Sequence, residues 1–104
     1  MTDFDYQKIN ELIHSRIRLA IMSVLINLEE ADFTFLKQKV NTTDGNLSIH
    51  LSKLENAGYI SVNKIFEDKK PRSLYRITKK GRDDFEAYIE HLEEIIKAGS
   101  IEES

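Results

Sequence analysis

The sequence predicts a mainly α-helical chain with one small β-hairpin, and three observations lead to this fold class. Apolar residues recur at helical spacing in several segments, whereas the region around Pro71, the only proline, is rich in Tyr, Ile, Val and Phe. A polar triplet, residues 41–43, separates two of the helical segments. With 104 residues, the chain has room for one core. We therefore expect a single domain over residues 1–97 and a disordered tail over residues 98–104.

The first third of the chain predicts three helices. Apolar spacing indicates a first helix over residues 9–13, and Ser15 is placed to cap a second one. The apolar stripe of that second helix continues without a break over residues 17–28, so we expect it in the core. A short third helix is predicted over residues 33–40, with Thr34 as its cap.

The fourth predicted helix is the most regular of the chain. Thr43 stands at its N-cap, and Asp44 lies in the first turn, where a negative charge suits the helix dipole. Gly58 stands where a left-handed glycine commonly ends a helix. The buried stripe of this helix is expected to consist of Leu47, Leu51 and Leu54.

A hairpin and a last helix complete the chain. Residues 59–66 and 73–77 predict strands, joined by a charged turn over residues 67–71. Thr78 is placed to cap a final helix whose apolar stripe continues to Ile96. Two helices joined by a short turn form a helix-turn-helix, and the hairpin directly behind them makes a winged helix-turn-helix. In such a unit the second helix enters the major groove of DNA.

Charge is distributed very unevenly along the chain. The formal net charge of the whole chain is -3. Residues 37–82 contain 11 Lys or Arg and 4 Asp or Glu, a local +7, while the remainder holds 4 bases and 14 acids, or -10. A polyanion would be attracted to the basic segment, so the distribution favours a nucleic-acid partner.

The composition also excludes several classes of protein. There is no cysteine, so disulfides and thiolate metal sites are ruled out. The three histidines are too scattered to indicate a metal site, and we expect neither a metal nor a cofactor. No phosphate-binding loop, nucleophile elbow or metal-hydrolase spacing occurs, so we do not expect an enzyme. With no predicted membrane span or signal peptide, we expect a cytoplasmic protein.

The outer face of the fourth helix points to a contact surface. It combines short hydrogen-bonding side chains with an exposed isoleucine, a mixture suited to base edges and thymine methyl groups. Taken singly, the polar residues are common on any solvated helix. An exposed isoleucine such as Ile49 is unusual there, because solvent does not stabilise it. Gly45 costs a helix about 1 kcal/mol relative to alanine, which indicates close approach of either the preceding helix or a phosphate. The face comprises Gly45, Ile49, Ser52, Lys53 and Asn56, flanked by Asn46, Ser48 and His50.

The tip of the predicted hairpin is basic. Lys69, Lys70 and Arg72 surround the proline and are placed to reach phosphates, and Arg72 also suits a narrow minor groove. Lysines at a hairpin also protect a sheet edge from pairing with other strands, without any ligand. The contact interpretation is favoured because the basic surface extends further, through Lys64, Arg76, Lys79 and Lys80.

Three stretches resemble a known family. DFTFLKQKV, GNLSIHLSKLENAGYI and PRSLYRITKKG are similar to the MarR/ArsR-type winged-helix transcriptional regulators, in particular the short single-domain bacterial and archaeal members. The resemblance covers nearly the whole chain, from SRIRLAI to the last helix. It implies sequence-specific binding of double-stranded DNA as a homodimer. ArsR-like metal sensors use cysteine ligands, which this chain lacks, and a small-molecule effector is left unassigned.

The resemblance also implies site residues. The groove contacts are expected at Thr43, Asn46, Ser48, Ile49, His50 and Lys53, and the wing contacts at Lys64, Lys69, Lys70 and Arg72. Members of this group often dimerise through their terminal helices, and a final helix of about 28 Å exceeds what one small body can cover. The dimer interface is therefore expected at Ile9, Leu12, Ile13, Phe85, Tyr88, Ile89, Leu92, Ile95 and Ile96.

Two other functions compete with this reading. A winged helix can serve as a protein–protein interaction module without specific DNA binding, since a fold does not determine a function. Such a module has no need for a basic wing together with a polar recognition face. RNA binding would more often present aromatic side chains for base stacking, and the outer face of the fourth helix has none.

Overall fold

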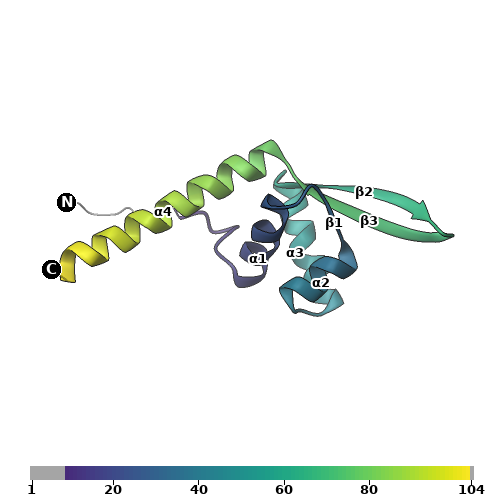
Figure 1. Cartoon of the computed structure of the whole chain (residues 1–104), viewed down its shortest axis with the longest axis horizontal. Coiled ribbons are helices and arrows are strands. Elements are labelled where there is room, and N and C mark those ends of the chain that lie inside the picture. The colour runs from purple at the N-terminus through teal and green to yellow at the C-terminus, as the bar shows by residue number, and fades with distance from the viewer. Residues whose placement is uncertain (1–8, 104) are drawn as a thin grey trace.

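The computed structural model describes residues 9–103, and the side chains of residues 9–98. Within this range the chain forms four helices and a three-stranded antiparallel sheet of order β1-β3-β2 (Figure 1). The helices and strands are α1 (Arg16–Ile26), β1 (Ala31–Asp32), α2 (Phe33–Val40), α3 (Asp44–Asn56), β2 (Ile60–Glu67), β3 (Lys70–Ile77) and α4 (Lys79–Glu103). The winged helix-turn-helix predicted from the sequence is thereby confirmed.

Helix α1 lies at the centre of the molecule. It packs against α2, α3, β3 and α4, and its side chains Ile21, Met22 and Leu25 have no exposed surface. The predicted leucine stripe of α3 is confirmed, because Leu47, Leu51 and Leu54 are all buried. Helix α1 ends at Ile26, earlier than predicted, and Leu28 lies on the surface beyond it.

The first predicted helix is wrong for the residues that the structure describes. Residues 9–15 form turns, in which the Asn10 side-chain oxygen accepts hydrogen bonds from the backbone N–H groups of Leu12 (3.0 Å) and Ile13 (3.2 Å). Such side-chain bonds offer the backbone an alternative to a continuing helix. Ile13 is fully buried, so the segment fastens the chain to the core; residues 1–8 lie outside the described part.

The helix ends follow the predicted chemistry with two corrections. Ser15 stands at the N-cap of α1 as predicted, but its side chain makes no capping hydrogen bond. The Thr43 hydroxyl accepts from the Asn46 N–H at 3.2 Å and caps α3 as predicted. Gly58 ends α3 with a φ of +80°, and the Tyr59 N–H donates to the Leu54 carbonyl at 2.9 Å, as in a Schellman motif. Helix α2, however, is capped by Asp32 instead of Thr34: its carboxylate accepts from the Phe35 N–H at 2.8 Å.

The hairpin is tighter than predicted. Its turn consists of Asp68 and Lys69 alone, with φ of 52° and 64°, and two left-handed residues match the twist of a two-residue hairpin. Pro71 lies within β3, opposite Phe66. The missing N–H of proline is tolerated there because the short β1, which the sequence did not predict, pairs only with Leu74 and Tyr75 and leaves that part of β3 as an edge.

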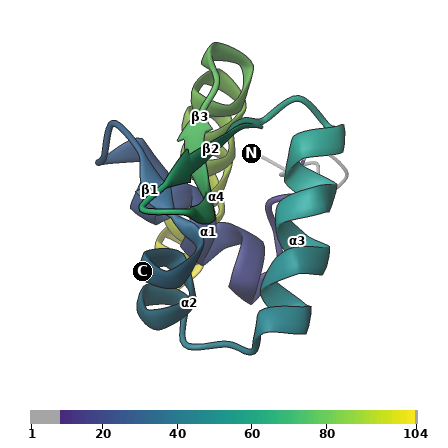
Figure 2. The same cartoon turned by 90° about the vertical axis from the view of Figure 1, so that its right-hand side faces the viewer.

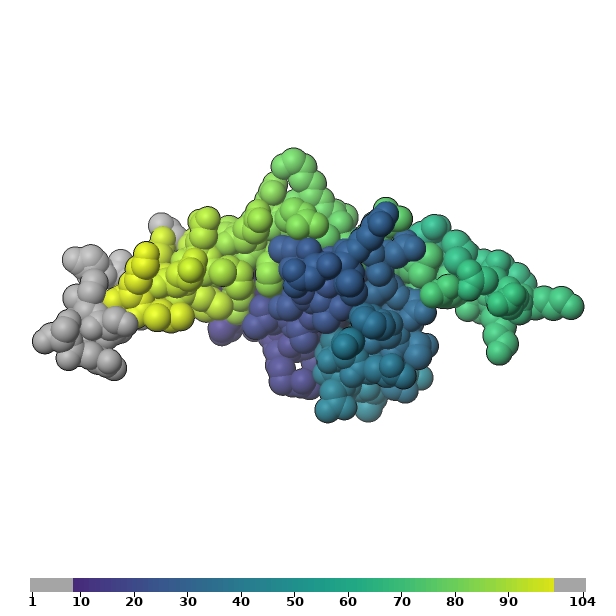
Figure 3. Space-filling model, viewed as in Figure 1, coloured from purple at the N-terminus to yellow at the C-terminus, as the bar shows by residue number. Residues whose placement is uncertain are grey.

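The wing, β2 and β3, and helix α4 project in opposite directions from the central helices (Figures 1 and 3), and the molecule measures 60 × 25 × 21 Å. At their junction the Thr78 hydroxyl accepts from the Gly81 N–H at 3.0 Å and donates to the Gly58 carbonyl at 2.6 Å, so Thr78 caps α4 as predicted. A Cβ at Gly81 would lie 2.1 Å from the Tyr59 carbonyl oxygen, so only glycine fits. Helix α4 continues through Glu103 and does not end near Gly99 as predicted.

Candidate nucleic-acid interface

Helix α3 presents its polar face to solvent. No other described element covers its outer side in Figure 2. Ile49 is 54% exposed, far more than any other apolar residue of this helix. The polar residues expected in the groove are exposed as well, with His50 half-buried: Thr43, Asn46, Ser48 and Lys53. The groove-facing set of the sequence analysis therefore lies on one accessible surface.

His50 is held by an arginine from α1. The Nη1 atom of Arg18 lies 2.8 Å from His50 Nδ1, and Arg18 Nε donates to the Leu12 carbonyl. Because a guanidinium can only donate, Nδ1 accepts and the ring hydrogen is on Nε2. Burial, with Arg18 and Lys53 nearby, lowers the pKa of His50 below its ordinary 6.5. His50 therefore offers a fixed N–H donor in its neutral form.

Gly45 has open space around it. A Cβ built at this position meets nothing within 4 Å, so close approach of the preceding helix does not explain the glycine. The other explanation from the sequence, close approach of a phosphate, is left standing. Nearby, Lys37 of α2 forms an ion pair with Asp44 at 2.8 Å, which joins the two helices of the helix-turn-helix at the start of α3.

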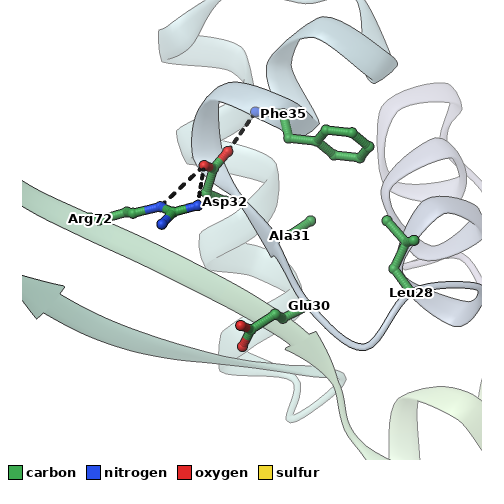
Figure 4. Close-up of a pocket in the computed structure, with 6 residues that line it drawn as sticks. All are labelled: Leu28, Glu30, Ala31, Asp32, Phe35 and Arg72. Carbon is green, nitrogen blue, oxygen red and sulfur yellow. Dashed lines mark hydrogen bonds and ion pairs between the residues drawn. The ribbon is translucent and has the colours of Figure 1, made fainter. Parts of the chain in front are cut away.

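The arginines of the wing are occupied within the chain. Arg72 donates from Nη2 and Nε to Asp32 Oδ2 at 3.0 and 3.3 Å, and from Nη1 to Glu67 at 2.8 Å. Arg76 pairs with Glu30 at 3.1 Å. The backbone hydrogen bond from Phe35, aided by Arg72, lowers the pKa of Asp32 (Figure 4). One carboxylate thus caps α2 and holds the wing to it.

The lysines near the tip of the wing behave differently. Lys64, Lys69 and Lys70 are exposed and form no ion pair with any residue that the structure describes. Closer to the helices, Lys79 pairs with Asp83 at 2.8 Å, and Lys80 donates to the Ala57 carbonyl at 3.0 Å. The predicted basic surface therefore divides into lysines of the wing that form no ion pair and cations that are bonded within the chain.

A shallow hollow of about 270 Å³ adjoins the Asp32–Arg72 pair (Figure 4). Its apolar wall is formed by Leu28, Ala31 and Phe35. Its charged groups are already bonded: Arg72 to Asp32 and Glu67, and Glu30 to Arg76. These bonds hold the wing in place.

The predicted dimer residues divide into two groups. Ile13, Phe85 and Tyr88 are buried within the single chain, at 0%, 7% and 2% exposure, so they have almost no surface to offer a second subunit. This corrects their assignment: they belong to the core, because α4 packs its first turns on the central helices. The remaining residues are exposed or half-buried: Ile9, Leu12, Ile89, Leu92, Ile95 and Ile96.

Sequence reasoning missed several residues that shape this surface. Arg18 was not singled out because its partner His50 lies 32 positions away. Asp32 appeared to be an ordinary residue before α2, although its position before a helix is a typical capping signal. Within the described residues, no group of three His, Asp or Glu is placed to bind a metal, and no helix is long and apolar enough to cross a membrane.

Comparisons with known proteins address the family. A family model described as "Winged helix DNA-binding domain" matches residues 17–96. The chain is 37% identical over 87 residues to the uncharacterized protein MJ0432 of Methanocaldococcus jannaschii, a match covering 84% of this chain and 95% of that protein. It is 30% identical over 83 residues to the uncharacterized HTH-type transcriptional regulator YdgJ of Bacillus subtilis, covering 80% of this chain and 50% of YdgJ.

Solved structures agree in fold. The transcriptional regulator homologue of Pyrococcus horikoshii OT3 superposes with a TM-score of 0.80 at 27% identity, covering 86% of this chain and 88% of that chain. A PadR-like transcription factor from Bacteroides fragilis gives 0.69 at 19% identity, with 82% and 90% covered. A MarR-family regulator from Silicibacter pomeroyi gives 0.63 at 18% identity, with 80% and 55% covered. From the match over residues 17–96 and these likenesses, the chain belongs to the winged-helix DNA-binding domains of transcriptional regulators.

Proposed function

We propose that this protein is a sequence-specific regulator of transcription that binds double-stranded DNA as a homodimer, with α3 in the major groove. The observation that carries the proposal is the outer face of α3, where Ile49 is 54% exposed among short polar side chains. A thymine methyl group would bury the isoleucine, and Asn46 and Ser48 have the donors and acceptors that base edges require. Without such a contact, the side chain of Ile49 stays exposed to water, which does not stabilise it.

His50 gives this face a defined hydrogen-bond polarity. Since Arg18 donates to Nδ1, the free Nε2–H is a donor and pairs with an acceptor such as guanine O6 or adenine N7. Arg18 is therefore a positioning residue: it does not reach the base, but it determines which atom of His50 does. Arg18→Lys would keep the charge and lose the planar fork that makes both bonds.

The wing is proposed to follow the phosphate backbone beside the groove. On the wing, Lys64, Lys69 and Lys70 have no internal partner among the described residues, so they are available to phosphates. Arg72 instead orients the wing through Asp32 and Glu67. A phosphate contact by Arg72 would require that it exchange these carboxylates.

The homodimer is proposed to form through the part of α4 that extends beyond the core. Ile96 is 66% exposed and Ile89 is 38% exposed, while Leu92 and Ile95 between them are half-buried. A hollow of about 490 Å³ between α1 and α4, lined by Ile26, Phe85 and Ile89 with two glutamates, continues this apolar stripe. A second α4 packed along it would cover the stripe.

Sedimentation tests the dimer separately from DNA binding. We expect a dimer for the unmodified chain and a monomer for Ile96→Asp, because a carboxylate would then lie in the apolar interface. Glu94→Ala, at an exposed polar position of the same helix, serves as the control and should leave the dimer intact. A monomer at all concentrations for the unmodified chain, or a dimer that persists in Ile96→Asp, would show this interface to be wrong.

Selection from a random pool of duplexes tests the function as a whole. The purified chain is allowed to bind at near-physiological salt, and the bound duplexes are sequenced. We expect an enriched inverted repeat with half-sites about one helical turn apart, and a changed preference for His50→Ala or Asn46→Ala. If the unmodified chain enriches no sequence, sequence-specific binding is rejected and a protein-interaction module is favoured.

A further inference from the structure

We propose that Phe66 and Pro71 near the tip of the wing form an apolar wedge that enters the minor groove of bound DNA and bends the duplex. The inference rests on the proposed DNA binding and adds a second kind of contact to it. Cations alone would hold the wing to phosphates without regard to the shape of the groove. Phenylalanine and proline are among the side chains that proteins insert from the minor groove to unstack a base step.

Phe66 is the most exposed large apolar residue among those described. Its exposure is 73%, against 54% for Ile49 and 66% for Ile96. Strand pairing places Phe66 directly opposite Pro71, so the two rings stand next to each other on one face of the ribbon. Both residues are exposed, although Pro71 also borders a shallow hollow that it shares with Phe33 and Thr34 at the start of α2.

The wedge lies on the face of the wing opposite to the salt bridges. Side chains alternate along a strand, and the register places Phe66 and Pro71 on the same face as Lys64, Val62 and Tyr75. Arg72 and Arg76, bonded to Asp32 and Glu30, are on the other face.

The charges around the wedge favour DNA over a protein partner. Lys64 shares the face of the apolar pair, Lys69 is in the adjoining turn, and Lys70 lies next to Pro71 on the opposite face. None of the three forms an ion pair among the described residues. Glu67 is neutralised by Arg72 at 2.8 Å, and Asp68 in the turn is the carboxylate that opposes the three lysines. An apolar centre with a net positive rim complements the floor of a minor groove between two rows of phosphates. The apolar surface of a second copy would not compensate those lysines.

The wing is also held in place before DNA arrives. The turn at Asp68 and Lys69 is a tight two-residue one, and Arg72 connects β3 to the N-cap of α2 through Asp32. A wedge on a fixed ribbon does not lose conformational freedom on binding, which lowers the cost of the contact. We expect the bend to centre where the wing lies, at a flexible pyrimidine–purine step such as TA.

The test compares Phe66→Ala with a conservative variant, Phe66→Leu, and with Leu28→Ala, an exposed apolar truncation on the loop after α1. Binding is measured to the duplex recovered by selection and to a synthetic duplex of mixed sequence, at several salt concentrations. Bending is measured by energy transfer between dyes at the duplex ends. Thermal unfolding checks that each variant is folded.

We expect Phe66→Ala to bind about tenfold more weakly and to bend DNA less, with unchanged unfolding temperature and unchanged slope of affinity against salt. Phe66→Leu should retain most of the bend, and Leu28→Ala should match the unmodified chain. Equal affinity and equal bending for Phe66→Ala would overturn the wedge while leaving DNA binding intact. If Phe66→Ala changes the oligomeric state and leaves the bending unchanged, Phe66 belongs to a protein contact and the wedge proposal is also overturned. Failure of the unmodified chain to bind either duplex would reject the proposed function itself.

Discussion

The base and the tip of the wing both carry cations, but those at the base are bonded within the chain and those at the tip face solvent. At the base, Arg76 is bonded to Glu30 and Thr78 to the Gly58 carbonyl, and Arg72, further along the wing, is bonded to Asp32. At the tip, Lys69, Lys70 and Phe66 face solvent without such partners among the described residues. A change at the base should therefore alter folding, and a change at the tip should alter binding alone.

This contrast shows how far a count of charges can mislead. The basic segment owes its formal +7 to arginines and lysines alike, yet several of these cations are neutralised by acids from the surrounding sequence. Glu30 and Asp32 belong by sequence to the acidic remainder of the chain, but in space they lie against β3. On the wing, the cations that remain for a polyanion are therefore Lys64, Lys69 and Lys70.

The largest effect should come from the glycine where α4 meets the wing. Gly81→Ala places a Cβ 2.1 Å from the Tyr59 carbonyl oxygen, and this backbone contact relaxes only if α4 moves. We expect a loss of about 3 kcal/mol in the free energy of unfolding, measured by urea denaturation. Gly45→Ala is the matched control: it lies in the first turn of α3 with nothing within 4 Å, and should be stabilising by about 0.5–1 kcal/mol. Equal effects at the two glycines would contradict this account of the junction.

Next in size is the carboxylate that caps α2 and holds Arg72. Asp32→Ala removes both bonds and should lower the free energy of unfolding by about 1–2 kcal/mol, whereas Asp32→Asn keeps a good capping group and should lose less. The pKa of Asp32 is lowered in the fold, so its contribution is present above the ordinary value of 3.8 and is lost as pH falls through the folded pKa. Comparing both variants with the unmodified chain at neutral and acidic pH tests this; an Asn variant as unstable as Ala would assign the effect to Arg72 alone.

The lysines of the tip should change binding without changing stability. Replacing Lys69 and Lys70 by alanine should reduce the slope of log affinity against log salt by about two, since each phosphate contact contributes about 0.9. Arg72→Ala should leave that slope nearly unchanged, because its guanidinium is bonded to Asp32 and Glu67. Fluorescence anisotropy titrations at several salt concentrations measure all three chains. A lower slope for Arg72→Ala than for the double lysine variant would reverse the assignment.

The smallest effect concerns His50 and pH. Its pKa is lowered in the fold, so the unfolded chain takes up the proton first as pH falls below 6.5, and the stability that His50 contributes is lost through that window down to the folded pKa. We expect the difference in unfolding free energy between the unmodified chain and His50→Gln to shrink over this range. A difference that is constant with pH would mean that burial and the nearby Arg18 and Lys53 do not lower the pKa of His50 in the fold.

Much of the fold could be predicted because it rests on local signals. The leucine stripe of α3, the caps at Thr43 and Thr78 and the stop at Gly58 each depend on residues within a few positions of one another. The exposed face of α3 follows from the same periodicity, since the residues opposite a buried stripe must face outward. The incorrect predictions of the first helix and of the hairpin loop have local causes as well. Asn10 diverts its backbone into a turn, and a turn of Asp68 and Lys69 shortens the loop.

By itself, the sequence determined the order of α1 to α4 and of the hairpin strands, the core stripe of α3 and the residues that its outer face presents, because periodicity and capping act over short distances. Only the tertiary structure decided which charges remain free, which nitrogen of His50 carries the hydrogen, and that Ile13 and Tyr88 are core residues. Those outcomes depend on pairs such as Arg72 with Asp32, 40 positions apart, and His14 with Tyr88, 74 apart. A contact between distant segments forms only when the packed helices bring them together.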